Sequence, residues 1–94
     1  EAKQWDKYLK QVDADPRITV SHLGLLVALL RLAYMQKENK IIRVSRSKLM
    51  KLSHIRSPPT FHRYFKELQD YGYITYVPSY HPGFRSTVTF KNTL

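Results

Sequence analysis

The alternation of apolar and polar side chains divides the chain into four helical stretches and three short β-type runs. The first stretch, residues 2–12, is predicted to be an amphipathic helix that ends at residues 13–16. Its apolar stripe recurs at spacings of three and four residues and consists of Trp5, Tyr8, Leu9 and Val12. We expect this stripe to pack on the core of its own chain. The alternative is a homodimerisation arm that uses Trp5 and Tyr8.

The second helix is expected to be surrounded by other elements, because residues 23–35 are apolar on almost every side. Ser21 is the expected N-cap, and the helix is expected to run to about Asn39. A helix of this kind should lie at the centre of the domain, with the first helix on one flank. A short β-type run, residues 41–44, follows it.

Two further helices with a short turn between them come next. Ser45 is the expected N-cap of a brief helix, and residues 53–56 form the turn after it. Ser57 then caps a longer helix with Pro58 at its first position, where the missing N–H has no cost. Gly72 is well placed to stop this helix in the left-handed conformation that glycine adopts easily.

The longer helix, residues 58–71, is predicted to have two distinct faces. At 100° per residue its apolar side chains share one arc and should face the core: Phe61, Tyr64, Phe65, Leu68 and Tyr71. The opposite arc is polar and basic and holds Pro59, His62, Arg63, Lys66 and Asp70, with Thr60 and Gln69 at its edges. One face should therefore anchor the helix while the other projects outward.

Two strands joined by a Pro-Gly turn complete the pattern. Residues 73–77 and 86–90 are aromatic and β-branched, and the linking segment 78–85 is rich in turn formers. Helix, turn, helix and hairpin in this order are typical of a winged helix-turn-helix. The expected fold class is mainly α with a small β-hairpin (α+β). We expect a single domain over residues 1–94, with an extra N-terminal helix in 1–15 and the winged helix-turn-helix in 21–90.

Charge makes nucleic acid the favoured partner. Sixteen Lys and Arg oppose seven Asp and Glu, which gives a net charge of +9. Residues 41–94 hold nine of the cations and only two of the acids, and so +7 of the total. The sequence therefore predicts sequence-specific double-stranded DNA binding, with helix 58–71 in the major groove and the 78–85 wing on the backbone or minor groove.

Arg63 is the expected base contact, because a guanidinium can bond both O6 and N7 of guanine. Thr60 and His62 are candidates for further base or phosphate bonds, and Lys66 is a candidate phosphate contact. Other candidates lie on the brief helix, in the turn, at the start of the longer helix and in the wing: Arg46, Ser47, Lys48, Lys51, Arg56, Ser57, Pro59, Tyr80, His81 and Arg85.

No pattern in the sequence favours catalysis. The four histidines lack metal-binding spacing, no cysteine is present, and the three glycines are isolated, so no phosphate-binding loop exists. We expect no catalytic, cofactor or metal site. The longest apolar run, residues 23–30, is far shorter than the ~20 residues of a membrane span, and no signal-peptide pattern opens the chain. The expectation is a cytoplasmic, nucleoid-associated protein with no membrane partner.

Several segments resemble winged-helix proteins of Bacteroides-type mobilizable or conjugative transposons, over most of the chain from about Ile18 to Phe90. The matching positions are Ser45, Arg46, Leu49 to Ser53, Thr60, His62, Lys66 to Leu68 and Gly72 to Ile74. The Pro58-Pro59 doublet departs from that pattern. The resemblance implies a DNA-binding accessory protein of a mobile element, acting in transcriptional regulation or in excision and mobilisation. It also implies a recombinase or mobilisation partner, and no catalytic residues.

Two other functions stay open on the sequence. Winged helices also bind proteins, so a protein–protein interaction module is one alternative. The DNA-binding part of a plasmid-type replication initiator is the other. Loss of duplex binding as salt rises would favour DNA, whereas salt-insensitive binding to a protein would favour the interaction module.

Overall fold

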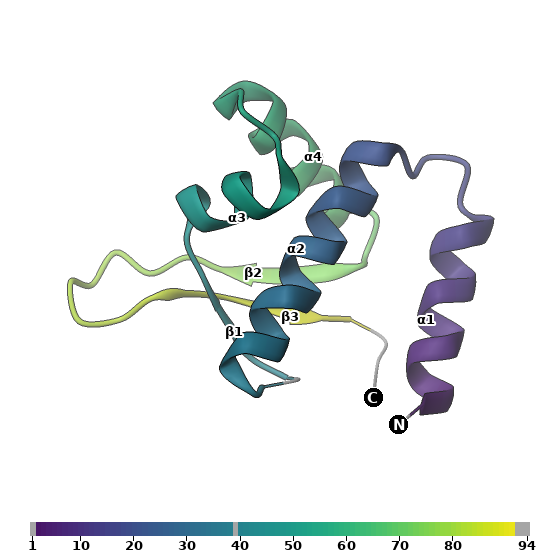
Figure 1. The fold of residues 1–94 in the computed structure, drawn as a ribbon, viewed down its shortest axis with the longest axis horizontal. Coiled ribbons are helices and arrows are strands. Elements are labelled where there is room, and N and C mark those ends of the chain that lie inside the picture. Colours follow the sequence, from purple (N-terminus) through teal and green to yellow (C-terminus); the bar gives the residue numbers. More distant parts are fainter. Residues whose placement is uncertain (1, 39, 92–94) are drawn as a thin grey trace.

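The computed structural model describes residues 2–38 and 40–91, and of Ala2 and Gln4 only the backbone. Within these residues the chain is an α+β structure with four helices and a three-stranded antiparallel sheet (Figure 1). The elements in order are α1 (Ala2–Ala14), α2 (Val20–Gln36), β1 (Ile42–Val44), α3 (Arg46–Ser53), α4 (Pro58–Asp70), β2 (Ile74–Val77) and β3 (Ser86–Phe90). Each helix and strand predicted from the pattern is confirmed, and the ends differ from the prediction by at most three residues.

The start of α2 differs from the prediction. Thr19, not Ser21, is the N-cap, and Ser21 lies inside the helix. The reason is His22, whose Nδ1 accepts the backbone N–H of Thr19 at 2.9 Å while the Thr19 hydroxyl accepts the N–H of His22. This reciprocal pair is a capping box in which His22 takes the place that Glu or Gln usually fills.

The end of α2 also comes earlier than the prediction. The helix stops at Gln36, and Lys37 adopts the left-handed conformation with φ of 53°. The N–H of Glu38 then bonds the carbonyl of Ala33 at 2.9 Å, which closes the last turn. Asn39, the predicted end, lies outside the described residues.

Helix α2 packs against α3, β1 and α4. Its inner face is buried and consists of His22, Leu25, Leu26, Ala28, Leu29, Leu32 and Ala33. Helix α3 comes very close to it at Gly24, where a Cβ atom would lie 3.3 Å from the carbonyl oxygen of Ser53. Glycine therefore allows the two helices to touch along their backbones.

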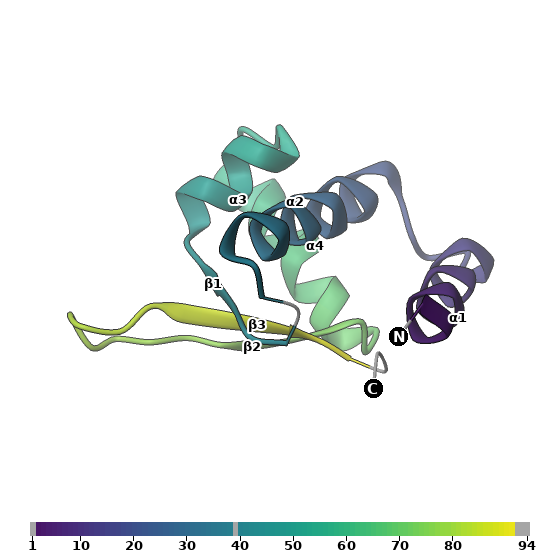
Figure 2. The same ribbon diagram turned by 60° about the horizontal axis from the view of Figure 1, so that its bottom comes forward.

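The strand order is β1-β3-β2, so β3 is central. Val88 on β3 pairs with Ile42 on one side and Tyr76 on the other, and it is fully buried. The sequence pattern predicts the β2–β3 hairpin, whereas the pairing of β1 with β3 has no local signal. The loop between β2 and β3 reaches beyond the helices, as Figure 2 shows.

Helix α1 packs on the base of the hairpin. The Tyr8 hydroxyl donates to the carbonyl of Tyr73 at 2.9 Å, and Trp5 meets the ring of Phe90 edge to face at 5.2 Å. Tyr8 is only 2% exposed, so its ring belongs to the core of its own chain. The sequence left two possibilities for the apolar stripe of α1, packing on its own core or a homodimerisation arm. For Tyr8 the structure shows packing on its own core.

Two tyrosines at this junction should make the protein sensitive to alkali. Burial raises the pKa of Tyr8, and burial together with a 2.8 Å bond to Asp15 raises the pKa of Tyr73 to about 12. Unfolded tyrosine ionises near pH ~10, so the free energy of unfolding should fall as pH rises from ~10 towards 12. Denaturant titrations at pH 8 and above measure this loss.

The double variant Tyr8→Phe/Tyr73→Phe should lose stability more gradually than the wild type across the same pH range, because it lacks both phenols. Tyr34→Phe is the matched control, since the Tyr34 ring is 86% exposed. It should keep the wild-type pH dependence. An equal alkaline loss in the double variant and the control would contradict the prediction.

Candidate nucleic-acid interface

The fourteen predicted site residues are all exposed to solvent. They lie on four parts of the fold: α3, the turn after it, α4 and the loop between β2 and β3. Two stretches of the chain, residues 46–66 and 80–85, therefore present cations and hydrogen-bonding groups outward. The position of each group follows from local features of these elements.

Helix α3 is oriented by its cap and its apolar side. The Ser45 hydroxyl accepts the N–H of Lys48 at 3.3 Å, as predicted for an N-cap. Leu49 is 1% exposed and fixes the helix to the core. Arg46 and Lys51, with Lys48, remain on the solvent side.

The turn between α3 and α4 is well defined. His54 ends α3 in the left-handed conformation with φ of 62°, and its N–H bonds the carbonyl of Lys51 at 3.3 Å. Ile55 is buried and holds the turn against the core, whereas Arg56 is exposed. The turn thus places one cation between the two helices.

Helix α4 has the two faces that the sequence predicted. Phe61, Phe65 and Leu68 are buried, and Tyr64 and Tyr71 are partly buried against the core. Ser57 caps the helix, and both prolines lie in its first turn. The Pro58-Pro59 doublet therefore opens a regular helix.

Arg63 and Lys66 both project from α4 and both form ion pairs. Arg63 Nε lies 3.4 Å from Glu67 Oε2, and Lys66 Nζ lies 3.0 Å from Asp70 Oδ2. The cationic side chains remain 67% and 75% exposed. Exposed pairs of this spacing contribute only ~0.3–0.5 kcal/mol each. A guanine contact to Arg63, at ~1–3 kcal/mol, would outweigh its pair with Glu67.

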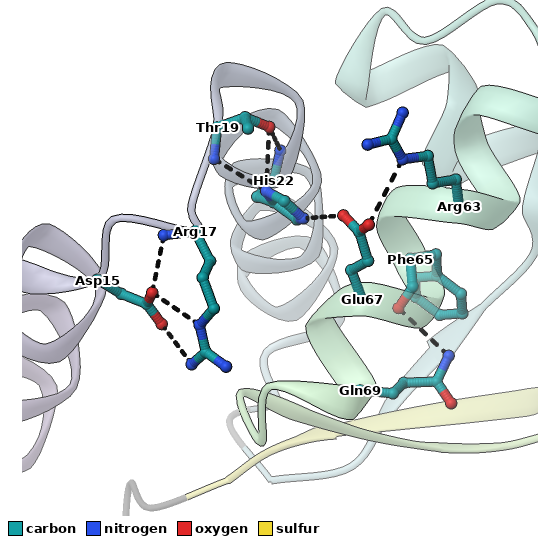
Figure 3. Close-up of polar contacts among 8 residues, drawn as sticks. All are labelled: Asp15, Arg17, Thr19, His22, Arg63, Phe65, Glu67 and Gln69. Atoms are coloured by element: carbon teal, nitrogen blue, oxygen red, sulfur yellow. Dashed lines mark hydrogen bonds and ion pairs between the residues drawn. The ribbon is translucent and has the colours of Figure 1, made fainter.

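A polar network behind Arg63 holds Glu67 in place (Figure 3). Because Nδ1 of His22 accepts the N–H of Thr19, the ring carries its proton on Nε2, which donates to Glu67 Oε1 at 2.8 Å. His22 is 1% exposed and is enclosed by the rings of Tyr64 and Tyr71. Glu67 thus connects the cap of α2 with the outward face of α4.

The sequence pattern does not predict this network. The pattern indicates no functional role for His22 or Glu67. The two residues are 45 positions apart. A glutamate on the polar side of a helix has no local signal that indicates a buried partner.

The loop between β2 and β3 carries exposed rings beside a cation. Tyr80 is 93% exposed and Phe84 is 71% exposed. The N–H of Ser79 donates to the Ser86 hydroxyl at 3.0 Å and closes the base of the loop, and Arg85 is exposed beside it. Tyr80 and Arg85 were predicted here, whereas Phe84 was not.

A polar depression of about 230 Å³ lies between β1, α3 and the same loop. Its lining brings together three cations from separate elements, and the lining residues include no carboxylate: Gln36, Arg43, Val44, Ser45, Lys48 and Arg85. The Gln36 amide bonds both the N–H and the carbonyl of Arg43, at 2.9 and 2.7 Å. This arrangement is suited to an anion.

Arg43 was missing from the predicted site. The buried-exposed-buried pattern of β1 points its side chain away from the core, and that alternation is visible in Ile42-Arg43-Val44. Its neighbours across the sheet could not be read from the sequence.

No protein-family model matches the chain, and comparisons with curated proteins and with solved structures give no match either. Among the described residues, no three His, Asp or Glu side chains gather as a metal site requires. No helix in residues 2–38 and 40–91 is long and apolar enough to cross a membrane.

Proposed function

We propose that this chain is a winged helix-turn-helix protein that binds double-stranded DNA sequence-specifically. Helix α4 enters the major groove, α3 and the turn hold the phosphate backbone, and the loop over residues 78–85 lies on the backbone or minor groove. The observation that carries the proposal is the anchoring of α4. Its apolar face is buried while Arg63 and Lys66 remain more than half exposed on the other side.

The distribution of charge supports the same function. Cations from β1, α3, the turn, α4 and the loop are all exposed. Glu67 and Asp70 are the acids of residues 41–94, and each faces a cation of α4. A polyanion would meet a surface of one sign once these weak pairs exchange for phosphate.

The resemblance to transposon proteins supports a role as accessory factor of a mobile element. Such a protein would regulate transcription or shape DNA during excision, beside a recombinase or mobilisation partner. An adjacent integrase or mobilisation gene is the expected genomic neighbourhood. Footprinting on the ends of such an element would identify the bound site.

Selection of bound sequences from a random duplex pool, followed by affinity measurements on the selected site, tests the proposal. Arg63→Ala should weaken binding by about tenfold to a hundredfold and relax the base preference at one position. Lys66→Ala should weaken binding to all sequences and lower the salt slope by ~1. The difference between the variants follows from a base contact in one and a phosphate contact in the other.

Lys10→Ala is the matched control, because Lys10 forms an i,i+4 pair with Asp6 at 3.0 Å and is 76% exposed on α1. It removes the same charge from a helix outside the interface and should leave affinity unchanged. Identical effects of Arg63→Ala and Lys66→Ala would refute the assigned roles. A wild-type protein that selects no sequence, or that binds a protein partner without salt dependence, would refute DNA recognition.

A further inference from the structure

The loop over residues 78–85 holds two large aromatic rings in water. Tyr80 is 93% exposed and Phe84 is 71% exposed. Among the described Phe, Tyr and Trp side chains, the other exposed ring is that of Tyr34 on α2. The loop extends past the helices at one end of the molecule (Figure 1). Packing of the core therefore gives no reason for the two rings.

The turn that carries Phe84 is fixed by its own contacts. The Phe84 N–H donates to the carbonyl of His81 at 3.1 Å, with Pro82 and Gly83 between them. Proline at the second position of a four-residue turn holds φ near ~−65°, which suits this place. The His81 N–H bonds Ser79 Oγ at 3.3 Å, and the His81 ring meets the Phe84 ring edge to face at 5.6 Å. A defined turn thus presents Phe84 outward.

The charge around the rings favours a polyanion as their partner. Residues 71–94 include no Asp or Glu, and Arg85 directly follows Phe84. Arg85 also lines the polar depression together with Arg43 and Lys48. The aromatic loop is therefore continuous with the cationic surface. A nucleic-acid backbone held at this depression passes directly beside Phe84.

The minor groove of DNA admits a loop but not a helix. The groove is ~6 Å wide, whereas a helix with its side chains is ~10–12 Å across. While α4 occupies the major groove, the loop is thus suited to the minor groove. Several proteins that bend DNA insert an apolar side chain such as Phe or Leu between two base pairs from this groove, and the duplex kinks by ~20–90°. Phe84 has the chemistry and the exposure that such an insertion requires.

We propose that Phe84 enters the minor groove, inserts between two stacked base pairs and kinks the duplex. Arg85 holds the adjacent phosphate, and Tyr80 lies at the edge of the groove. The inference rests on the proposed DNA binding and adds a bending activity to it. Base reading by Arg63 and bending by Phe84 belong to separate elements, so one can be lost without the other.

Fluorescence of 2-aminopurine tests the insertion. The probe is the selected duplex with single adenines replaced by 2-aminopurine, whose emission is quenched while the base is stacked. Wild-type protein should raise the emission at one base step beside the α4 site. Phe84→Ala should abolish this rise and weaken binding about tenfold. Phe84→Leu should keep the rise, because leucine is also an apolar wedge.

The bend is measured by energy transfer between dyes at the two ends of the same duplex. Wild-type protein and Phe84→Leu should bend it by ~20–90°, and Phe84→Ala should leave it close to straight. Arg63→Ala should still bend the DNA that it binds. Pyrimidine–purine steps kink easily, whereas A-tracts are stiff. Replacing a TA step by AA at the inserted position should therefore weaken wild-type binding more than Phe84→Ala binding.

Tyr34→Ala is the matched control, because Tyr34 is an exposed ring (86%) on a helix outside the loop. It should keep the wild-type emission, bend and affinity. A wild-type complex with a straight duplex and unchanged emission would overturn the insertion and leave DNA binding intact. Equal results for Phe84→Ala and Tyr34→Ala would also overturn it, and would leave the two rings to a protein partner. Failure to bind any duplex would instead refute the proposed function and this inference together.

Discussion

Raising the salt concentration from 50 to 200 mM is expected to weaken duplex DNA binding about a thousandfold. Each phosphate that the protein neutralises releases counterions, and the logarithm of the affinity falls by ~0.9 per contact for each tenfold rise in salt. About six contacts give a thousandfold loss over this range. The exposed cations around α4 are numerous enough: Arg43, Arg46, Lys48, Lys51, Arg56, Lys66 and Arg85. Fluorescence anisotropy of one labelled duplex over a potassium chloride series measures the slope.

Two triple variants separate a specific surface from overall charge. The variant Arg43→Ala/Lys48→Ala/Arg85→Ala removes the cations around the polar depression and should make the slope shallower by about three. The variant Lys3→Ala/Lys7→Ala/Lys10→Ala removes three exposed cations of α1 and should leave the slope unchanged. Equal changes in the two variants would show that net charge alone drives binding. A slope near zero for the wild type would contradict nucleic-acid binding altogether.

His22→Ala is expected to lower the free energy of unfolding by ~3 kcal/mol. The ring is 1% exposed, so its removal leaves a cavity beside Tyr64 and Tyr71. The Thr19 N–H also loses its acceptor, and the capping box of α2 opens. Glu67 loses its 2.8 Å bond from Nε2. Urea unfolding followed by circular dichroism measures the total loss in the free energy of unfolding.

His62→Ala provides the matched control for this prediction, because the same side chain is removed from an exposed position on α4. His62→Ala should change the free energy of unfolding by no more than ~0.5 kcal/mol. His22→Gln should lower the free energy of unfolding by an amount between those of His22→Ala and His62→Ala. Glutamine can accept the N–H of Thr19 in the capping box but does not fill the volume of the imidazole ring. If His22→Ala were as stable as His62→Ala, the buried network would have no structural role.

Much of the candidate surface could be predicted because its causes are local. The two faces of α4 follow from a 3.6-residue period, and its start follows from Ser57 and Pro58 in adjacent positions. Gly72 adopts φ of 86° directly after the C-cap residue Tyr71, as its place in the sequence indicated. Solvent exposure of Arg63 and Lys66 follows from the same period. Features of this kind need no knowledge of distant residues.

Two features could not be predicted from the local pattern. The start of α2 moved from Ser21 to Thr19 because His22 completes the capping box there and also reaches Glu67 on α4. Both hydroxyl residues are good caps by propensity, so no local rule separates them. Likewise, the sequence allowed Tyr8 to face either its own core or a partner. The hydrogen bond from its hydroxyl to the carbonyl of Tyr73 places it in its own core.

The sequence by itself determined the helices and strands, the apolar side of each, and the cationic face of α4. These features follow from hydrophobic period, caps and turn residues, which act within one element. Only the tertiary structure decided the strand order β1-β3-β2, which brings Arg43 beside Lys48 and Arg85. Only the tertiary structure left one face of the apolar helix α2 uncovered. Pairing and coverage depend on which surfaces meet, and a one-dimensional pattern does not specify its partner.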